Sequence, residues 1–349
     1  MKFMDIIEKL KQADLRGRGG AGFPTWQKWQ MVKYAAAAEG EPRPDGRGDR
    51  KYVICNVSEG EPAVFKDDFI LERWPEVVIE GITLAMDAVG AQMGYIYLRK
   101  DYYDKHKEKL TEIIGDKPIE LFREPCGYLG GEETTLLESM EGSPNGEARL
   151  VGGKRCEPRL KPPFPPQAGL FSYPTLINNL ETLYFAAKIS RGEYKKTRFY
   201  CISGDTNSPG VFERGEILAI REVLEKTGNL PQNEFFVQAG GGASGTILLD
   251  SELDQPLTGA GSIVVHDLQK TDARKLGLSW AEFFINENCG KCAPCREGVY
   301  RLREIFSQDK VDIAKAKEIV ALLGSASFCP FGKGVANSFG SLIDKLMLK

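Results

Sequence analysis

The sequence is poor in histidine, in net charge and in long apolar segments. Only two of its 349 residues are histidines, His106 and His266, so neighbouring histidines cannot form the basis of a metal site. The 46 basic residues nearly balance the 49 acidic ones, and a net charge of −3 gives no broad basic surface to attract nucleic acid. No apolar run approaches the length of a membrane-spanning helix. We therefore expect no nucleic-acid partner and no direct membrane insertion.

The N-terminus also lacks the pattern of a secretory signal. In residues 1–10, MKFMDIIEKL, apolar positions recur at helical spacing and are interrupted by charges, whereas a signal peptide has an unbroken apolar core. We therefore expect a helix here and a cytoplasmic protein. In the cytoplasm, the eight cysteines are expected as metal ligands or buried thiols rather than as disulfides.

The length and composition indicate more than one domain. A chain of 349 residues with 42% hydrophobic residues can bury a large core, and two or three domains are expected. In the first half, β-rich runs alternate with helical periodicity, giving strands at 51–57 and 95–98 and helices at 65–89 and 102–114. This alternation predicts a parallel sheet. Asn56 and Glu59 would then lie at the carboxyl end of a strand, where such sheets bind ligands.

The pattern changes after about Thr197. Short strands with turn signals at 199–203, 208–211 and 262–265 predict a small mixed β domain, with a glycine turn at 240–245. From Ser279 onward, apolar residues at helical spacing predict a helical bundle. The positions are Val299, Leu302, Ile305, Phe306, Ile313, Ala316, Ile319, Val320, Leu323, Phe339, Leu342, Ile343 and Leu346. The polar residues 39–49 predict an exposed loop.

Four cysteines carry the strongest chemical signal. Cys289, Cys292 and Cys295 are spaced to bind three irons of one cubane, and Cys329 supplies the fourth ligand, so we predict a [4Fe–4S] cluster. Zinc is the rival, but structural zinc sites usually pair two CxxC motifs or use histidine. Unligated core cysteines are the simpler alternative. The other four cysteines are expected as ordinary buried thiols, and they are Cys55, Cys126, Cys156 and Cys201.

Two glycine-rich segments are weaker signals. Residues 17–23 form a loop whose backbone N–H groups can approach a phosphate or a flat ring, but the loop follows a helix, and a plain loop is an equal alternative. Gly131 precedes Glu132 and Glu133 at an expected helix start. The carboxylates of these two residues suit either helix capping or hydrogen bonding to ribose hydroxyls. Hydrogen bonding of these carboxylates to the ribose hydroxyls would favour NAD over NADP, because they would repel a 2′-phosphate.

Several motifs stand in the order of one family: residues 17–25 (GRGGAGFPT), 55–67, 131–134 (GEET), 158–165 (PRLKPPFP), 174–182 (PTLINNLET) and 289–298 (CGKCAPCREG). In these motifs the chain resembles the NADH-binding flavoprotein subunit of respiratory complex I and its relatives in NAD-linked hydrogenases and formate dehydrogenases. The resemblance covers essentially the whole chain.

The resemblance implies an α/β fold in three parts. A Rossmann-like parallel-sheet domain (1–195) would bind FMN and NADH, a small β-grasp domain (196–270) would follow, and a C-terminal helical bundle (271–349) would carry the [4Fe–4S] cluster. Residues implied to surround the flavin are Gly17, Gly19, Lys28, Asn56, Glu59, Gly131, Asn178 and Asn179. Residues implied to hold NAD(H) are Gly20, Phe23, Glu61, Glu132, Glu133 and Phe164, with the two phenylalanines stacking on adenine, although most aromatic residues simply belong to the core.

The chain departs from the family pattern at five positions. Ser58 stands in place of an aspartate that helps to bind FMN, and Gly130 in place of a cysteine. Ala63 and Trp26 replace glycines, and Met31 replaces a second adenine-stacking aromatic residue.

The resemblance implies an NADH:acceptor oxidoreductase module. Hydride would pass between NAD(H) and FMN, and single electrons would pass to the cluster, with no catalytic side chain because the cofactors carry the chemistry. Implied partners are iron–sulfur subunits, including a thioredoxin-like [2Fe–2S] subunit and a catalytic dehydrogenase or hydrogenase subunit. The alternative is a non-catalytic iron–sulfur electron relay or scaffold subunit.

Overall fold

The structure is a computed structural model that describes residues 5–35, 50–142, 150–151 and 154–348. The exposed loop predicted at 39–49 lies outside the described residues. The chain divides into two compact units, and each is described by itself. The first comprises residues 1–60 and 67–196, and the second comprises residues 61–66 and 197–349. The three-domain division with boundaries near 195 and 270 stays a prediction.

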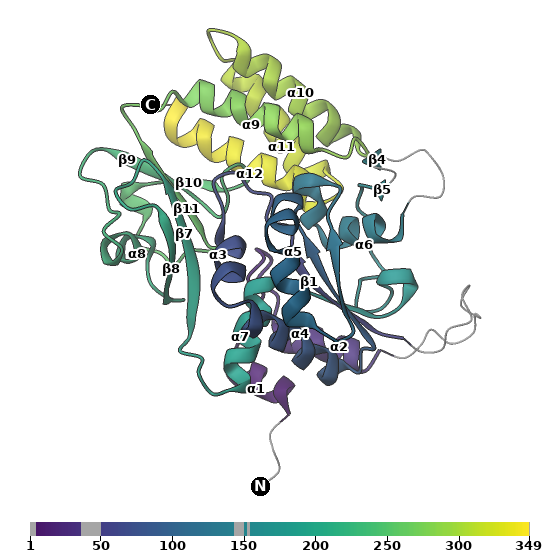
Figure 1. The fold of residues 1–349 in the computed structure, drawn as a ribbon. Helices are drawn as coiled ribbons and strands as arrows, with labels where there is room; N and C mark the ends of the chain where they lie inside the picture. The colour runs from purple at the N-terminus through teal and green to yellow at the C-terminus, as the bar shows by residue number, and fades with distance from the viewer. Residues whose placement is uncertain (1–4, 36–49, 143–149, 152–153, 349) are drawn as a thin grey trace. The chain divides into compact units, whose positions relative to one another are not determined.

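The first unit is built on a four-stranded parallel sheet in the order β3-β2-β1-β6 (Figure 1). Its strands are β1 (Tyr52–Val57), β2 (Met93–Leu98), β3 (Ile119–Arg123) and β6 (Thr175–Asn179). Helices α3 (Lys66–Arg73) and α4 (Pro75–Val89) connect β1 to β2, and α5 (Lys100–Ile114) connects β2 to β3. The predicted parallel sheet is therefore confirmed.

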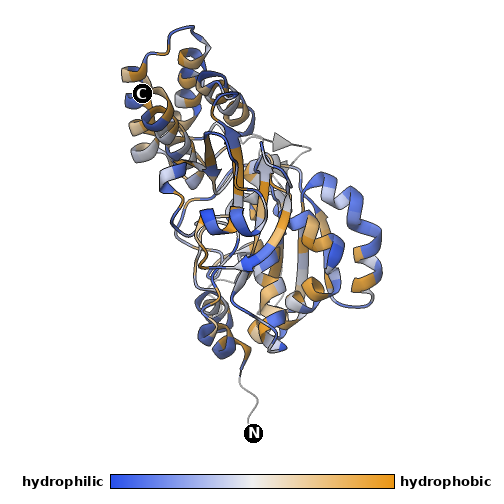
Figure 2. Ribbon diagram, turned by 90° about the vertical axis from the view of Figure 1, so that its left-hand side faces the viewer, coloured by the Kyte–Doolittle hydropathy of each residue, from blue (hydrophilic) through white to orange (hydrophobic). Residues whose placement is uncertain are grey.

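The helix predicted over 65–89 is two helices. Pro75 is the first residue of α4, where its missing N–H costs no hydrogen bond, but the proline cannot continue α3. Gly90 ends α4 at φ +74°, a conformation that favours glycine. Figure 2 shows apolar residues along the strands and polar residues on the outward faces of helices, as expected for a sheet covered by helices.

The remaining elements of the first unit are α1 (Ile6–Gln12), α2 (Thr25–Lys33), η1 (Gly127–Gly131), α6 (Glu133–Glu141), β4 (Leu150–Val151), β5 (Lys154–Arg155), η2 (Leu170–Ser172) and α7 (Leu180–Ser190). The helix expected at the N-terminus is present as α1. Of the four cysteines expected as buried thiols, Cys55 and Cys201 are buried and form no disulfide.

The expectation was wrong for Cys126 and Cys156, which form a disulfide with a Cα–Cα separation of 5.4 Å. Cys126 directly precedes η1 and Cys156 directly follows β5, so the bond joins two segments that are 30 residues apart. Sequence reasoning missed the pair because a disulfide depends on the distance between Cβ atoms in the fold and not on spacing in the chain.

The second unit contains a five-stranded mixed sheet in the order β10-β9-β11-β7-β8. Its strands are β7 (Thr197–Gly204), β8 (Gly210–Gly215), β9 (Phe235–Ala239), β10 (Thr246–Leu249) and β11 (Ser262–Asp267). Helix α8 (Ile220–Lys226) follows the β7–β8 hairpin, and β11 pairs in parallel with β7 at the centre of the sheet. The order of these elements along the chain is ββαβββ, which contains the ββαββ order expected of a β-grasp fold.

Four helices follow the mixed sheet: α9 (Ala273–Glu287), α10 (Ala293–Ser307), α11 (Ile313–Ala326) and α12 (Pro330–Leu342) (Figure 1). The short segment η3 (Asp250–Glu252) lies between β10 and β11, and η4 (Ile343–Met347) follows α12. The predicted bundle is confirmed, although α9 begins six residues before Ser279. Helix α12 contacts β10 through a hydrogen bond in which Ile247 N, on β10, donates to Ser341 Oγ, on α12, at 3.0 Å. No helix in the described part of the chain is long and apolar enough to cross a membrane.

Candidate cofactor sites

The strand order of the first unit places a topological switch point between β1 and β6. From β1 the chain passes to β2 on one side, whereas β6 pairs with β1 on the other side. Asn56 lies near the end of β1 and pairs in register with Asn179, the last residue of β6, while the preceding Asn178 pairs with Cys55. Crevices at the carboxyl ends of such strands are the usual ligand sites of open α/β sheets. Three of the predicted flavin residues therefore meet at one strand end.

The glycine loop closes over this strand end. Gly17 N donates to Phe23 O at 2.9 Å, and Arg18 N donates to Thr182 Oγ1, also at 2.9 Å, so the loop is a small hairpin anchored to α7. A Cβ atom on Gly19 would lie 3.1 Å from the Asn179 Cβ. Gly20 has φ +114°, a conformation that side chains rarely adopt, and an added Cβ there would meet open space. The backbone of the loop beside Asn179 is therefore not covered by side chains at Gly19 and Gly20.

Asn56 connects β1 to the turn before α6. Its Nδ2 donates to Gly131 O at 3.0 Å, and its Oδ1 accepts from Ser58 N at 3.1 Å. A Cβ atom on Gly131 would lie 2.9 Å from the Ser58 carbonyl oxygen, so only glycine fits there without movement. The turn that contains Gly131 therefore lies against the end of β1.

Glu59 and Asn179 are linked through Asp67, which was not predicted. Glu59 Oε2 accepts from Asp67 N and from the Tyr102 hydroxyl, each at 3.0 Å, and Asn179 Nδ2 donates to Asp67 Oδ2 at 2.9 Å. Burial and the nearby Glu59 raise the pKa of Tyr102, which keeps this phenol a hydrogen-bond donor. Glu59 is thus held in place at the start of α3.

Helix α2 contacts two of the predicted residues, Asn178 and Glu133. Trp29 Nε1 donates to Asn178 Oδ1 at 2.8 Å, and both groups are buried. The Lys28 ammonium, one residue earlier, pairs with the Glu133 carboxylate, and the Lys28 side chain is only 13% exposed. One helix therefore holds Asn178 and places a cation beside the start of α6.

Glu132 caps helix α6. Its Oε2 accepts from Thr134 N at 3.0 Å and from Thr135 N at 2.8 Å, and its Oε1 pairs with Lys161 at 2.6 Å. Burial acts to raise the pKa of Glu132, but the Lys161 ion pair and the threonine hydrogen bonds outweigh it, so the pKa lies below its ordinary value. Helix capping, the simpler alternative for this residue, is therefore realised in the structure.

The predicted adenine-stacking residues have accessible rings. Phe23 is 44% exposed at the end of the glycine loop, and Phe164 is 48% exposed in the segment before β6. Neither is a core residue, so the alternative that these aromatic rings simply fill the core does not apply to them.

Glu61 belongs to the second unit. Its carboxylate accepts from Ala243 N at 3.0 Å and from Ser244 N at 3.3 Å, so it holds the predicted glycine turn between β9 and β10. A Cβ atom on Gly241 would lie 2.6 Å from Glu61 Oε2. Ala63, a departure from the family pattern, has φ +60° and so keeps a backbone conformation that favours glycine.

The residues of the first unit fit a flavin mononucleotide. Gly19, Gly20 and Gly131 leave room for close approach to the backbone, and Asn56 and Asn179 place amide groups at the switch point. Lys28 provides the positive charge that a phosphate requires.

The four predicted cluster cysteines lie in the second unit at two helix starts. Cys292 is the N-cap of α10, Cys295 lies in its first turn, and Cys329 is the N-cap of α12. Burial raises the pKa of the Cys295 thiol, and the nearby Cys292, Cys329 and Cys289 thiols raise it further, as expected when four thiols gather without a metal charge. This donor set fits a [4Fe–4S] cluster.

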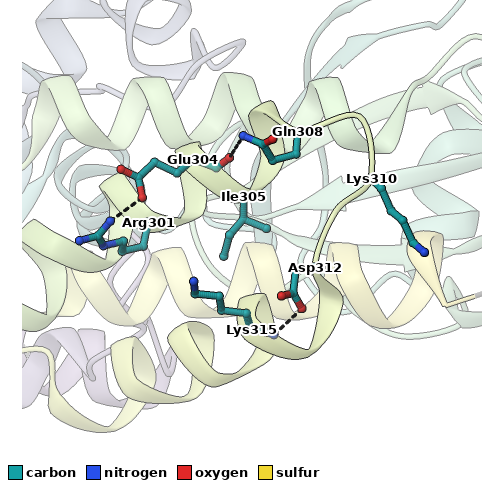
Figure 3. Close-up of a pocket in the computed structure, with 7 residues that line it drawn as sticks. All are labelled: Arg301, Glu304, Ile305, Gln308, Lys310, Asp312 and Lys315. Atoms are coloured by element: carbon teal, nitrogen blue, oxygen red, sulfur yellow. Dashed lines mark hydrogen bonds and ion pairs between the residues drawn. The ribbon is translucent and has the colours of Figure 1, made fainter.

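Among the described residues, no three His, Cys, Asp or Glu side chains are arranged to hold a single metal ion. Each cysteine of a cubane binds its own iron, so cluster ligands need not converge on one centre. Figure 3 shows a pocket near the C-terminal end of α10 that contains none of the residues predicted to bind a cofactor. It is lined by Arg301, Glu304, Ile305, Gln308, Lys310, Asp312 and Lys315.

Sequence reasoning missed Trp29, Asp67, Tyr102 and Glu124 as parts of the flavin region. Asp67 lies in the first turn of α3, and an acidic residue there gives only a weak signal of a binding site, because the helix dipole alone commonly explains it. The partners of the other three lie between 43 and 149 residues away in the chain, and no local pattern marks them.

Two family models match the chain. Residues 10–188 match the Nuo51 FMN-binding domain, and residues 275–347 match the NADH-ubiquinone oxidoreductase-F iron-sulfur binding region. The two predicted cofactor classes, FMN and a [4Fe–4S] cluster, are therefore confirmed. The match to a flavin-binding domain also favours the flavoprotein over the electron-relay alternative.

Similar proteins are named as subunits of redox complexes. The chain is 36% identical to the NADH-quinone oxidoreductase F 2 subunit of Rhizobium meliloti, over 95% of this chain and 84% of that protein. It is 30% identical to the NADP-reducing hydrogenase subunit HndC of Solidesulfovibrio fructosivorans, over 97% and 74% of the two chains. A crystal structure of an NAD⁺-reducing [NiFe]-hydrogenase in the H₂-reduced state matches with a TM-score of 0.82 and 30% identity. That match covers 98% of this chain, which spans 61% of the hydrogenase chain.

Proposed function

This chain belongs to the family of NADH-quinone oxidoreductase F subunits and the related NAD(P)-reducing hydrogenase subunits, and we propose that it passes hydride between NAD(H) and FMN and single electrons to a [4Fe–4S] cluster. The observation that carries the proposal is the meeting of the glycine loop, Asn56, Asn179 and the Gly131 turn at the switch point of the parallel sheet. A phosphate-bearing ring system fits such a crevice.

FMN accepts a hydride and releases electrons one at a time, and the cluster carries single electrons onward. The chain's own residues bind and orient these groups. We propose that the flavin residues are Gly17, Gly19, Lys28, Asn56, Glu59, Gly131, Asn178 and Asn179, and that the cluster ligands are Cys289, Cys292, Cys295 and Cys329. Lys28 supplies charge for the phosphate, and the asparagine amides hydrogen-bond polar groups of the flavin.

For the nicotinamide nucleotide we propose Gly20, Phe23, Glu61, Glu132, Glu133 and Phe164. The exposed rings of Phe23 and Phe164 are available for stacking on adenine. The carboxylates of Glu132 and Glu133 are suited to accept hydrogen bonds from ribose hydroxyls and to repel a 2′-phosphate.

We also propose that the chain works in the cytoplasm within a multisubunit complex. The relatives are named as subunits of quinone-reducing and hydrogen-oxidising complexes, which supports iron–sulfur subunits as partners. A thioredoxin-like [2Fe–2S] subunit and a catalytic dehydrogenase or hydrogenase subunit are the partners that we propose by resemblance.

The visible spectrum of the purified, FMN-reconstituted protein tests the proposal. We expect flavin absorption bands that bleach when NADH is added under anaerobic conditions. A brown iron–sulfur protein that binds no flavin would instead be an electron relay and would contradict the proposal.

A further inference from the structure

A buried carboxyl group that was not predicted lies behind the Gly131 turn. Glu124 directly follows β3 and is only 4% exposed. Its Oε2 accepts a 2.6 Å hydrogen bond from the hydroxyl of Ser58, which directly follows β1. Its backbone N–H donates to the carbonyl oxygen of Leu98, the last residue of β2, at 2.8 Å. The ends of three neighbouring strands therefore meet at Glu124.

Gly130 leaves the room that this carboxyl group needs. A Cβ atom at position 130 would lie 2.8 Å from the carboxyl carbon of Glu124, which is closer than real Cβ atoms approach their neighbours. The backbone of Gly130 does not have a positive φ, so the position of the Glu124 carboxyl group, and not backbone conformation, favours glycine here. Glu124 and Gly130 are thus a matched pair, with the larger side chain at one position and none at the other.

Ser58 contacts both Glu124 and the proposed flavin residues Asn56 and Gly131. Its N–H donates to Asn56 Oδ1 at 3.1 Å, and its carbonyl oxygen would lie 2.9 Å from a Cβ atom on Gly131. A serine hydroxyl has one proton, and Ser58 donates that proton to Glu124. Only the lone pairs of the Ser58 oxygen therefore remain for a further partner.

A purely space-filling role does not explain the carboxyl group. Burying a carboxyl group costs free energy unless hydrogen bonds compensate, and a neutral side chain would fill the same space without that cost. The resemblance expects an aspartate at position 58, where this chain has serine. In this chain the Glu124 carboxyl group accepts a hydrogen bond from the side chain at position 58.

We propose that Glu124 is a positioning residue for the flavin: it fixes the Ser58 oxygen as an acceptor for a hydrogen-bond donor of FMN, and the pair replaces the aspartate expected at position 58. This inference rests on the proposed flavin site. Because Glu124 acts through Ser58, removal of either group should have the same effect on FMN binding.

FMN affinity and the flavin midpoint potential test the proposal. The Kd of the full-length apoprotein for FMN is measured by quenching of flavin fluorescence, and the potential by anaerobic spectroelectrochemistry. We expect Glu124→Leu, which removes the acceptor of the Ser58 proton, and Ser58→Ala each to lower the affinity about tenfold, the effect of losing one hydrogen bond, and the double variant to lose no more than either single variant. The potential should rise in Glu124→Gln, because a nearby negative charge opposes the addition of electrons. Glu120→Gln, at an exposed position on β3, is the matched control and should change neither quantity.

A carboxyl swap gives a second test. Ser58→Asp alone places two carboxyl groups within hydrogen-bonding reach and should weaken FMN binding, whereas Ser58→Asp combined with Glu124→Gln should restore it. Unchanged affinity in Glu124→Leu, together with an unchanged potential in Glu124→Gln, would overturn the role of Glu124. If the leucine variant does not fold, unchanged affinity in Ser58→Ala would overturn it equally. A wild-type protein that binds no FMN would instead overturn the proposed function.

Discussion

The ammonium group of Lys28, on α2, pairs with the carboxylate of Glu133, in the first turn of α6, although 105 residues separate them in the chain. The lysine side chain is mostly buried and the glutamate side chain is 38% exposed. Lys28 is a proposed flavin residue and Glu133 a proposed nucleotide residue. The ion pair therefore joins the two proposed sites within the first unit.

We expect Lys28→Ala to lower FMN affinity by about ten- to a hundredfold, because a charge-assisted hydrogen bond to a phosphate contributes roughly 1.5–3 kcal/mol. Fluorescence of released FMN after dialysis measures the effect. The control is Lys33→Ala, on the same helix, where the lysine pairs with Asp5. The loss should persist in a Glu133→Gln background. If Lys28→Ala did not change FMN affinity in the Glu133→Gln variant, the only role of the lysine would be to neutralise the Glu133 carboxylate.

Replacement of single cluster cysteines should separate the two cofactors. We expect Cys289→Ser or Cys329→Ser to remove the [4Fe–4S] cluster, because each cysteine binds one iron of the cubane. The flavin residues of the first unit are not altered, so bleaching of the flavin by NADH should remain. Iron analysis and the visible spectrum measure the two effects, and Cys201→Ser, at a buried thiol of the second unit that forms no disulfide, is the control. Wild-type iron content in both ligand variants would show that the ligand assignment is wrong.

NADH should be a better donor than NADPH. Repulsion between a 2′-phosphate and the carboxylates of Glu132 and Glu133 should cost about 1–3 kcal/mol, which is roughly five- to 150-fold in kcat/KM. Glu133→Gln should reduce the discrimination, whereas Glu108→Gln, at an exposed position on α5, should not. Steady-state rates with both donors provide the measurement. Equal kcat/KM values in the wild-type protein would refute this reading of the carboxylates.

The Glu132 cap should make stability depend on pH. The pKa of Glu132 is lowered in the folded protein, so its contribution is fully present above the ordinary value of 4.5 and is lost as pH falls through the folded-state pKa. We expect Glu132→Gln to lower the free energy of unfolding by about 1 kcal/mol at pH 7 and to differ progressively less from wild type at acidic pH. Thermal unfolding from pH 3 to pH 7 measures this difference. A gap that stays constant over this range would contradict the assignment.

The Cys126–Cys156 disulfide should stabilise the oxidised protein. Removing a disulfide typically costs about 2–4 kcal/mol, so the double Cys126→Ser, Cys156→Ser variant should unfold more easily. A thiol reductant should destabilise the wild-type protein and should have a smaller effect on this variant. Peptide mapping without reduction identifies the bond directly. Alkylation of both cysteines in the unreduced, denatured protein would show that the bond is absent.

Local features of the sequence determined the type of most elements. The strand at 51–57 and the helix at 102–114 were predictable because periodicity and β-branched residues act over short stretches of chain. The CxxCxxC spacing predicted three of the proposed cluster ligands, because it places three cysteines around one helix start. The break between α3 and α4 was missed because helical periodicity continues across it, although Pro75 marks the start of a new helix.

Only the tertiary structure decided which distant residues meet. The Ser58–Glu124 and Asn179–Asp67 hydrogen bonds join residues 66 and 112 positions apart, and the Lys28–Glu133 ion pair joins residues 105 positions apart. Such contacts depend on the order and register of the strands, and one pattern of helices and strands is compatible with several strand orders. For the same reason, the sequence did not distinguish Cys126 and Cys156, which pair, from Cys55 and Cys201, which do not. Hydrophobic periodicity specifies which face of each element is buried, but packing of the whole chain specifies what that face contacts.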